Sequence, residues 1–422
     1  MAAFAAEARS FLEAHAGRAP EPEDFVWGVG DDRVAYFGAD PPEAEREKVR
    51  QAREWQRTRY ENGFGWITGP AGYGGRGLTP VHDMLYDAVE SEYDTPDTGV
   101  LGVVGLGMIG PTILAHGRQA AKDRWLPAMY RGDAIACQLF SEPDAGSDLA
   151  SVTTRAVRDG DRWTITGQKV WTSVAQHSQV GLALTRTDPD APKHRGITAF
   201  LVPMDAPGVE VRPLRQMTGG ADFNEVFLTE VEVPDENRLG EVGGGWTVAL
   251  TTLMNERATV GNEGAGPIAA ALSSLRLAGL MRAAGALNDG ALRARLAELL
   301  VDVMATGHLN ARAMRGLRGG VAPGPEMSVS KLMYAQNLTR AAHFVADVLG
   351  PRAIADSGEW GTYAWSELLL ATPALRILGG TEEIMKNILA ERVLGLPKEP
   401  GADNRVPFRE LRRSGTGEGG TR

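Results

Sequence analysis

The segment QLFSEPDAGSD (residues 138–148) marks the point at which the chain changes from a helical to an extended pattern. From about residue 136 to 243, apolar side chains recur with a period of two, which is typical of half-buried strands. Strand-like stretches, separated by Asp-Gly, Asp-Pro and Pro-Gly turns, cover residues 155–158, 162–167, 180–186, 198–202 and 225–231. The sequence therefore predicts a small β domain over residues 136–243.

Both flanks of this β domain have helical periodicity. On the N-terminal side, helices are expected over residues 1–17, 43–60 and 80–93. They are separated by an acidic, proline-containing stretch (16–42) and a glycine-rich loop (69–78). On the C-terminal side, the pattern indicates long bundle helices over 291–317 and 327–349.

This order predicts a mostly α-helical chain with a central β domain, and it excludes the βαβ alternation of a nucleotide-binding Rossmann domain. The expected parts are an N-terminal helical domain (1–135), the β domain (136–243), a C-terminal helical bundle (244–398) and a flexible tail (399–422).

Composition and charge narrow the class of protein. Of the 422 residues, 43% are hydrophobic and 23% are charged, which is typical of globular proteins with two or three domains. The formal charge of −10 argues against nonspecific nucleic-acid binding, because that requires a basic face. The lone Cys137 excludes a disulfide framework and favours a reducing, cytoplasmic location. Glu7, Arg9 and Glu13 make the N-terminus an amphipathic helix rather than a signal or transit peptide.

Several familiar motifs are absent or misplaced. Gly105, Gly107 and Gly110 form a G-x-G-x-x-G, but in a helical region they indicate close helix packing rather than dinucleotide binding. The apolar runs at 67–78 and 100–115 are broken by glycine or proline and fall short of a membrane span. No metal site is predicted, because ligand spacing such as H-E-x-x-H is missing around His177, His194, His308 and His343.

Two segments have the side chains of a ligand-binding site. The loop at 138–148 offers Ser141, Ser147 and several backbone donors, which suit a flavin edge or a ligand carbonyl, although an ordinary polar turn has the same composition. In GQKVWTS (167–173), Trp171 precedes two hydroxyl residues at a strand end, so it is either a flavin platform or a core residue.

Taken together, QLFSEPDAGSD, GQKVWTS and RILGGTEEIMKNILAERVLGLP resemble the acyl-CoA dehydrogenase family in order and spacing, over residues 73–396. The resemblance implies an N-terminal helical domain, a β-barrel-like middle domain and a C-terminal four-helix bundle. It also implies one noncovalent FAD per active site, a homotetramer or homodimer, and an electron-transfer flavoprotein or similar acceptor. The substrate would be an acyl-CoA or an acyl-carrier thioester.

The family's contacts carry over residue by residue. Phe140 and Ser141 would contact the flavin ring, with Trp171 and Ser173 beside it; Gln138 stands where the family usually has an aromatic residue. Thr381 and Glu383 would lie near the cofactor, although acids in the first turn of a capped helix are also favoured by the helix dipole. The resemblance assigns the substrate side to Ser147, Arg257 and Gly380. The arginine and phenylalanine that many members extend to a neighbour's FAD are not evident over residues 276–282.

By resemblance, the glutamate that would act as the catalytic base stands at the less common of the two positions used in the family. Medium-chain members have their glutamate where this chain has Gly379, whereas the isovaleryl-type base precedes an arginine, as Glu256 precedes Arg257. Glu256 shares a helix face with Ala249 and Leu253, where a carboxylate is costly unless it is paired or functional. From periodicity alone a salt bridge or an exposed edge position is equally compatible.

By resemblance, Glu256 removes the α-proton while hydride passes from Cβ to flavin N5, giving the trans-2-enoyl thioester. The backbone N–H of Gly379 would bind the thioester carbonyl. The helix-borne base and the GGRGLT and GGTEEI motifs look like the subgroup acting on branched, long or sterol-side-chain acyl groups. An acyl-CoA oxidase, a flavin monooxygenase and a non-catalytic subunit of a heteromeric dehydrogenase remain as alternatives.

Overall fold

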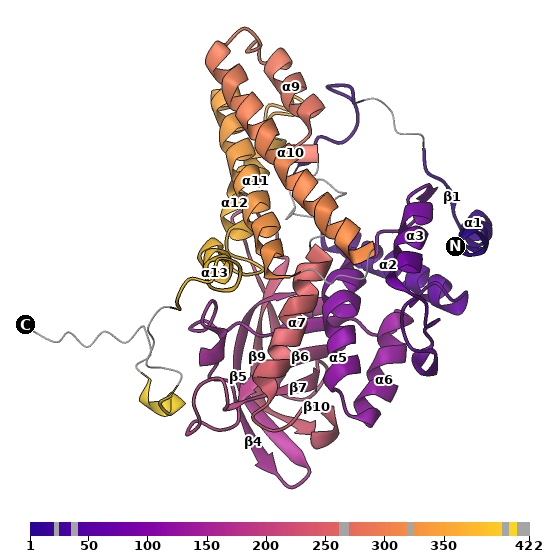
Figure 1. The fold of residues 1–422 in the computed structure, drawn as a ribbon, viewed down its shortest axis with the longest axis vertical. Coiled ribbons are helices and arrows are strands. Elements are labelled where there is room, and N and C mark those ends of the chain that lie inside the picture. The colour runs from indigo at the N-terminus through magenta and orange to yellow at the C-terminus, as the bar shows by residue number, and fades with distance from the viewer. Residues whose placement is uncertain (21–24, 35–40, 261–269, 319–323, 399–404, 412–422) are drawn as a thin grey trace, which may run out of the picture.

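A computed structural model describes residues 1–20, 25–34, 41–260, 270–318, 324–398 and 405–411 (Figure 1). The N-terminal part is helical, and its helices pack around a core of aromatic side chains that includes Phe11, Phe64 and Tyr86. Proline stands in the first turn of α2 and of α3, where its missing N–H is not needed. The elements are α1 (Ala2–His15), β1 (Gly17–Arg18), α2 (Pro42–Glu61), α3 (Pro80–Glu90), β2 (Tyr93–Asp94), α4 (Gly99–Leu101), the π-helix η2 (Gly102–Ile109), α5 (Gly110–His116) and α6 (Gln119–Tyr130).

The middle part is an eight-stranded sheet in the described residues, with the order β10-β7-β6-β4-β5-β9-β8 and β3 paired in parallel with β6. The five strands predicted from the alternating pattern are all present, and their inward faces form one buried cluster. The strands are β3 (Ala136–Leu139), β4 (Arg155–Asp159), β5 (Arg162–Ser173), β6 (Val180–Arg186), β7 (Ile197–Pro203), β8 (Val209–Leu214), β9 (Phe223–Pro234) and β10 (Arg238–Leu239).

The C-terminal part is helical again. Helix α7 lies across the sheet, where it packs against η2, α5 and β7, whereas α9 to α12 extend away from the sheet (Figure 1). The helices are α7 (Gly245–Val260), α9 (Ser274–Ala283), α10 (Gly290–Arg318), α11 (Ser328–Leu349), α12 (Ala364–Leu375) and α13 (Glu382–Ile388). The predicted fold class, mostly helical with a central β domain, is confirmed.

The apolar stretch Gly99–His116 forms a continuous helical segment through α4, η2 and α5. By length and composition alone, this segment of 18 residues could cross a membrane, so the expectation that the run falls short of a membrane span is wrong. In this fold it packs against β3, α6 and α7 instead. A Cβ on Gly110 would lie 2.6 Å from the Tyr130 hydroxyl, which explains the glycine and confirms that it serves close packing.

Residues 25–34, which we call the N-terminal strap, cross from the N-terminal helices to the bundle. The Trp27 and Trp360 rings meet edge to face at 4.9 Å, and the Trp360 indole N–H donates to the Gly30 carbonyl at 2.7 Å. The buried Arg276 guanidinium donates to the carbonyls of Asp31 and Arg33. The Arg276 guanidinium is therefore held by backbone carbonyls of its own chain.

A short C-terminal segment, residues 405–411, returns to the β domain. The Arg186 guanidinium lies 3.8 Å from the centre of the Phe408 ring, and the backbone N–H of Phe408 donates to the Ala191 carbonyl at 3.0 Å. This part of the predicted tail is therefore docked. The rest of that tail, residues 399–404 and 412–422, lies outside the described residues.

Candidate active site

The loop after β3 is supported from beneath by one buried carboxylate, Glu142. Its oxygens accept hydrogen bonds from the backbone N–H groups of Thr153 and Thr154, at 2.6 and 2.9 Å, and from the Thr153 hydroxyl at 2.8 Å. The Lys169 ammonium donates to the same carboxylate at 2.8 Å. Both ends of the loop at 140–154 are thus attached to one side chain.

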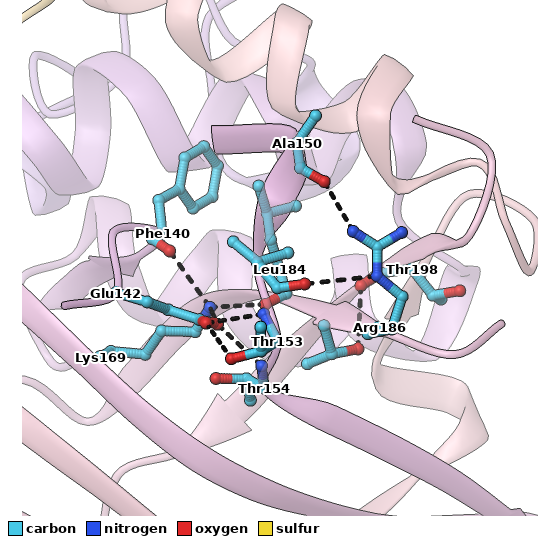
Figure 2. Close-up of polar contacts among 11 residues, drawn as sticks. Phe140, Glu142, Ala150, Thr153, Thr154, Lys169, Leu184, Arg186 and Thr198 are labelled. Carbon is cyan, nitrogen blue, oxygen red and sulfur yellow. Dashed lines mark hydrogen bonds and ion pairs between the residues drawn. The ribbon is translucent and has the colours of Figure 1, made fainter. Parts of the chain in front are cut away.

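Lys169, from the middle of β5, is fully buried and uses all three of its donors (Figure 2). Besides Glu142 it donates to the carbonyls of Phe140 and Leu184, at 3.1 and 2.7 Å. Arg186 on β6 adds bonds to the carbonyls of Ala150 and Lys193, both at 2.6 Å. These cations fix the backbone of the loop that the sequence predicts to bind the flavin.

Within this network, Glu142 and Lys169 neutralise each other inside the protein. Burial by itself would raise the pKa of Glu142, but the Lys169 charge and the hydrogen bonds at the carboxylate lower it to about 2. Burial lowers the pKa of Lys169, and the attraction of Glu142 opposes that shift. Because Glu142 also accepts two backbone N–H bonds, the pair is held as carboxylate and ammonium.

Trp171 lies at an irregularity in β5, where the register with β9 shifts between Lys169 and Thr172. Its backbone φ is 60°, in the left-handed region, and its indole is 61% exposed. A strained, exposed tryptophan is costly unless the ring has a partner. The ring is also 6.0 Å from Phe223, which packs against the bundle core. This surface, with the Ser173 hydroxyl at the end of β5, fits the flat aromatic ring of a flavin.

The predicted base lies on α7, which positions it beside the turn before α13. Glu256 is half-buried, and a Cβ built on Gly379 would lie 3.2 Å from its Oε1 atom. The two glutamate positions known from the family, which are 123 residues apart in this chain, therefore lead to the same small volume.

The turn itself requires glycine. Gly379 and Gly380 have φ values of 64° and 94°, a conformation that side-chain-bearing residues rarely adopt. The Thr381 hydroxyl then accepts from the backbone N–H of Ile384 at 3.2 Å, which confirms the predicted N-cap of α13. Glu382 is buried and paired with Arg376 at 2.8 Å, so it supports the turn, whereas Glu383 is exposed in the first helical turn.

The remaining predicted residues are spread around this surface. Gln138 is half-buried in β3, and Ser147 is exposed on the loop that Lys169 and Arg186 hold. The Phe140 ring is buried in the core, so any cofactor contact would be made by its backbone. Arg257 belongs to α7, but its side chain lies outside the described residues.

Sequence reasoning missed Glu142, Lys169, Arg186 and Lys331 as site-supporting residues. The ammonium of Lys331, on α11, donates to the carbonyls of Leu375 and Gly380 at 3.1 and 2.8 Å. One signal was available: Lys169 occupies an inward position of an alternating strand, where an unpaired cation is rarely tolerated. Among the described residues, no three His, Cys, Asp or Glu side chains are arranged to hold a metal ion.

This combination of an exposed aromatic platform, a polar loop fixed by buried cations and a helix-borne carboxylate at a glycine turn has the chemistry that a flavin-dependent oxidoreductase would need. Family models agree: acyl-CoA dehydrogenase N-terminal, middle and C-terminal domains match residues 37–133, 137–231 and 243–394. The chain belongs to the acyl-CoA dehydrogenase family, and its relatives imply a flavin cofactor.

Curated relatives include acyl-CoA dehydrogenase IpdE1 of Mycobacterium tuberculosis, 37% identical over 87% of this chain and 93% of that protein. Acyl-CoA dehydrogenase FadE34 of the same organism is 43% identical over 78% of this chain, which spans only 44% of FadE34. Among solved structures, the Tcur3481-Tcur3483 steroid ACAD is 25% identical, with a TM-score of 0.70 over 94% of this chain and 99% of that one. A chain of the ChsE4-ChsE5 complex from Mycobacterium tuberculosis is 26% identical, with a TM-score of 0.64 over 86% and 99%.

Proposed function

We propose that this protein oxidises an acyl-CoA thioester to the trans-2-enoyl thioester, with Glu256 as the base that removes the α-proton. One observation carries the proposal: the Glu256 carboxylate lies beside the Gly379 turn, the position from which other family members supply their base. The family match supports the reaction class, and the assignment of Glu256 is our own.

The chain's residues supply the requirements of the first step. The α-proton of a thioester is weakly acidic, so its base must be held in a partly desolvated position at the reacting carbon. Helix α7 does this, since it is packed on one side against η2 and α5. The turn at Gly379 brings backbone groups to the same place, where an N–H donor would stabilise the developing enolate oxygen.

FAD would be held between the β domain and the bundle. The residues assigned to it are Phe140 and Ser141 through the loop backbone, Trp171 and Ser173 at the end of β5, and Thr381 at the start of α13. When bound, it supplies an acceptor for the hydride that leaves Cβ. The ring would then shield the reacting carbons from water, and Ser147 would face the CoA side.

The resemblance to the branched, long or sterol-side-chain subgroup favours a substrate with a bulky acyl group. The similarity to a steroid ACAD and the apolar character of Gly99–His116, which packs against the helix that carries Glu256, support a steroid-derived or branched thioester. We further propose a cytoplasmic enzyme that passes electrons to an electron-transfer flavoprotein. Since solved relatives include heteromeric complexes, assembly with a second, different chain is proposed alongside the homotetramer.

A thioester panel tests the function. The purified holoprotein is mixed without oxygen with straight-chain, branched and steroid-ring thioesters, carried by CoA or by acyl carrier protein. We expect bleaching of the flavin absorbance and a product two hydrogens lighter, largest for the ring-bearing CoA thioester. Failure of every thioester to reduce the flavin would overturn the proposal, and rapid reoxidation of the reduced enzyme by air would identify an oxidase instead.

A further inference from the structure

Lys331 joins three elements at the catalytic end of the bundle. It stands in the first turn of α11, and its ammonium reaches the carbonyl of Leu375, the last residue of α12, and the carbonyl of Gly380 in the turn before α13. The carbonyls at a helix C-terminus carry partial negative charge, which favours a cation there. One side chain therefore anchors the Gly379–Gly380 turn to the bundle.

The same lysine approaches Glu256. The position that a Cβ of Gly379 would take is 3.2 Å from Glu256 Oε1 and 3.9 Å from Lys331 Cε, so α7 and α11 both reach this point. The acids acting on Lys331 are Glu382, Glu256 and Glu383, and they oppose the lowering of its pKa by burial. Glu382 is already neutralised by Arg376 at 2.8 Å.

We propose that Lys331 is a positioning residue for the dehydrogenation: it holds the Gly379–Gly380 turn in place and keeps the neighbouring Glu256 side chain in its carboxylate form, directed at the turn. This inference rests on the proposed function in one respect, since it takes Glu256 as the base. A half-buried carboxylate that must be ionised before it can accept a proton benefits from a fixed positive charge nearby. A lysine already bound to two carbonyls supplies that charge without moving.

The pH dependence of flavin reduction tests the charge. Lys331→Met should move the acid limb of the anaerobic reduction rate upward by about 1 pH unit, because an opposite charge nearby lowers a carboxylate pKa by that order. Below the limb the variant would be about tenfold slower than the wild type, and well above it the two rates would converge. Lys331→Arg should restore the wild-type limb. Lys386→Met, which removes an exposed cation from neighbouring α13, should leave the profile unchanged.

Hydrogen exchange tests the anchoring without any turnover. In Lys331→Met, the amides on either side of the turn, Leu378 and Glu382, which donate to the carbonyls of Ala374 and Arg376, should exchange about tenfold faster. The reason is that the two hydrogen bonds from Lys331 that tie the end of α12 and Gly380 to α11 are lost. Lys331→Gln, which keeps a donor but no charge, should show a smaller change in exchange and the full shift of the limb. An unshifted limb in an active Lys331→Met enzyme would overturn the charge role, and unchanged exchange would overturn the anchoring role. If no thioester reduces the wild-type flavin, the proposed function fails, and the exchange experiment still decides whether Lys331 holds the turn.

Discussion

Two lysines lie beside glutamates in this protein, one in the β domain and one in the bundle, and their surroundings differ. Lys169 is fully buried, its three donors are used, and Glu142 accepts further bonds from backbone N–H groups. Lys331 is half-buried beside a glycine turn, and Glu256 is half-buried as well. The closed, saturated Lys169–Glu142 ion pair supports a backbone shape, whereas Lys331 donates to two carbonyls and places its charge near Glu256 at the turn where we propose that the substrate binds. Both residues are lysines, and the degree of burial distinguishes the structural role of Lys169 from the proposed role of Lys331.

The largest expected effect is the loss of flavin reduction when Glu256 is replaced. Glu256→Gln should lower the rate of flavin reduction by roughly 10³-fold, within the range that a general base contributes, while folding and flavin content stay unchanged. Stopped-flow absorbance measures the rate, and the ratio of flavin to protein absorbance measures the content. Glu241→Gln, at a carboxylate that is 94% exposed, is the matched control. Wild-type rates in Glu256→Gln would remove this residue from the mechanism.

On the closed side, the expected effect is on stability. Lys169→Met leaves the Glu142 carboxylate buried without its cation, which should cost about 3–5 kcal/mol of unfolding free energy. The denaturation midpoint and the flavin content should both fall. Arg162→Met breaks the exposed ion pair with Glu232, whose side chains are 60% and 67% accessible, and should cost below about 1 kcal/mol. Equal costs for the two variants would show that enclosure does not distinguish the pairs.

The pH dependence of stability sharpens the same contrast. The pKa of Glu142 is lowered to about 2 in the folded state, so its contribution is present above the unfolded value and is lost as pH falls through about 2. Between about pH 4.5 and pH 2 the wild type should lose about 3 kcal/mol more than Glu142→Gln does. Denaturant titrations of both proteins at a series of pH values measure this difference. Parallel curves would contradict the depressed pKa.

The smallest expected effect concerns the Gly379 turn beside Glu256. Gly379→Ala places a Cβ 3.2 Å from Glu256 Oε1 at a φ of 64°, which should cost about 1 kcal/mol and slow flavin reduction by roughly tenfold. Gly285→Ala has the same backbone problem, with a φ of 71°, but nothing within 4 Å of the new atom. We expect it to lose stability without losing rate. A rate loss of the same size in both variants would mean that the carboxylate is not displaced.

The fold was predictable from periodicity because most of its elements are long enough to show it. The 3.6-residue pattern predicted α2, α10 and α11, and alternation predicted β5 and β6. Five strands were missed for physical reasons. Three of them, β1, β2 and β10, have only two residues each, which is too few to show any pattern. β3 has only four residues, three of them buried, so no alternation is visible, and β8 carries Pro213 with little burial.

The candidate site was only partly predictable. Motif likeness predicted Glu256 and the Gly379 turn, and these assignments stay predictions that the geometry supports. The supporting cations could not be found in this way, because their partners are set by packing between distant segments. Lys331 and Gly380 are 49 residues apart. Arg186 and Ala150 are 36 residues apart, and they come into contact only because β6 packs beside the loop that follows β3.

The N-terminal strap has a consequence for synthesis of the chain. Its hydrogen bond between Gly30 and Trp360 joins residues 330 apart in sequence. At about 5–20 residues per second, a ribosome needs roughly 15–65 s between the two ends of that contact. For that time Phe25 and Trp27 lack the Trp360 ring that packs against both of them in the folded protein, so their aromatic surface is not fully covered until the last helices are made.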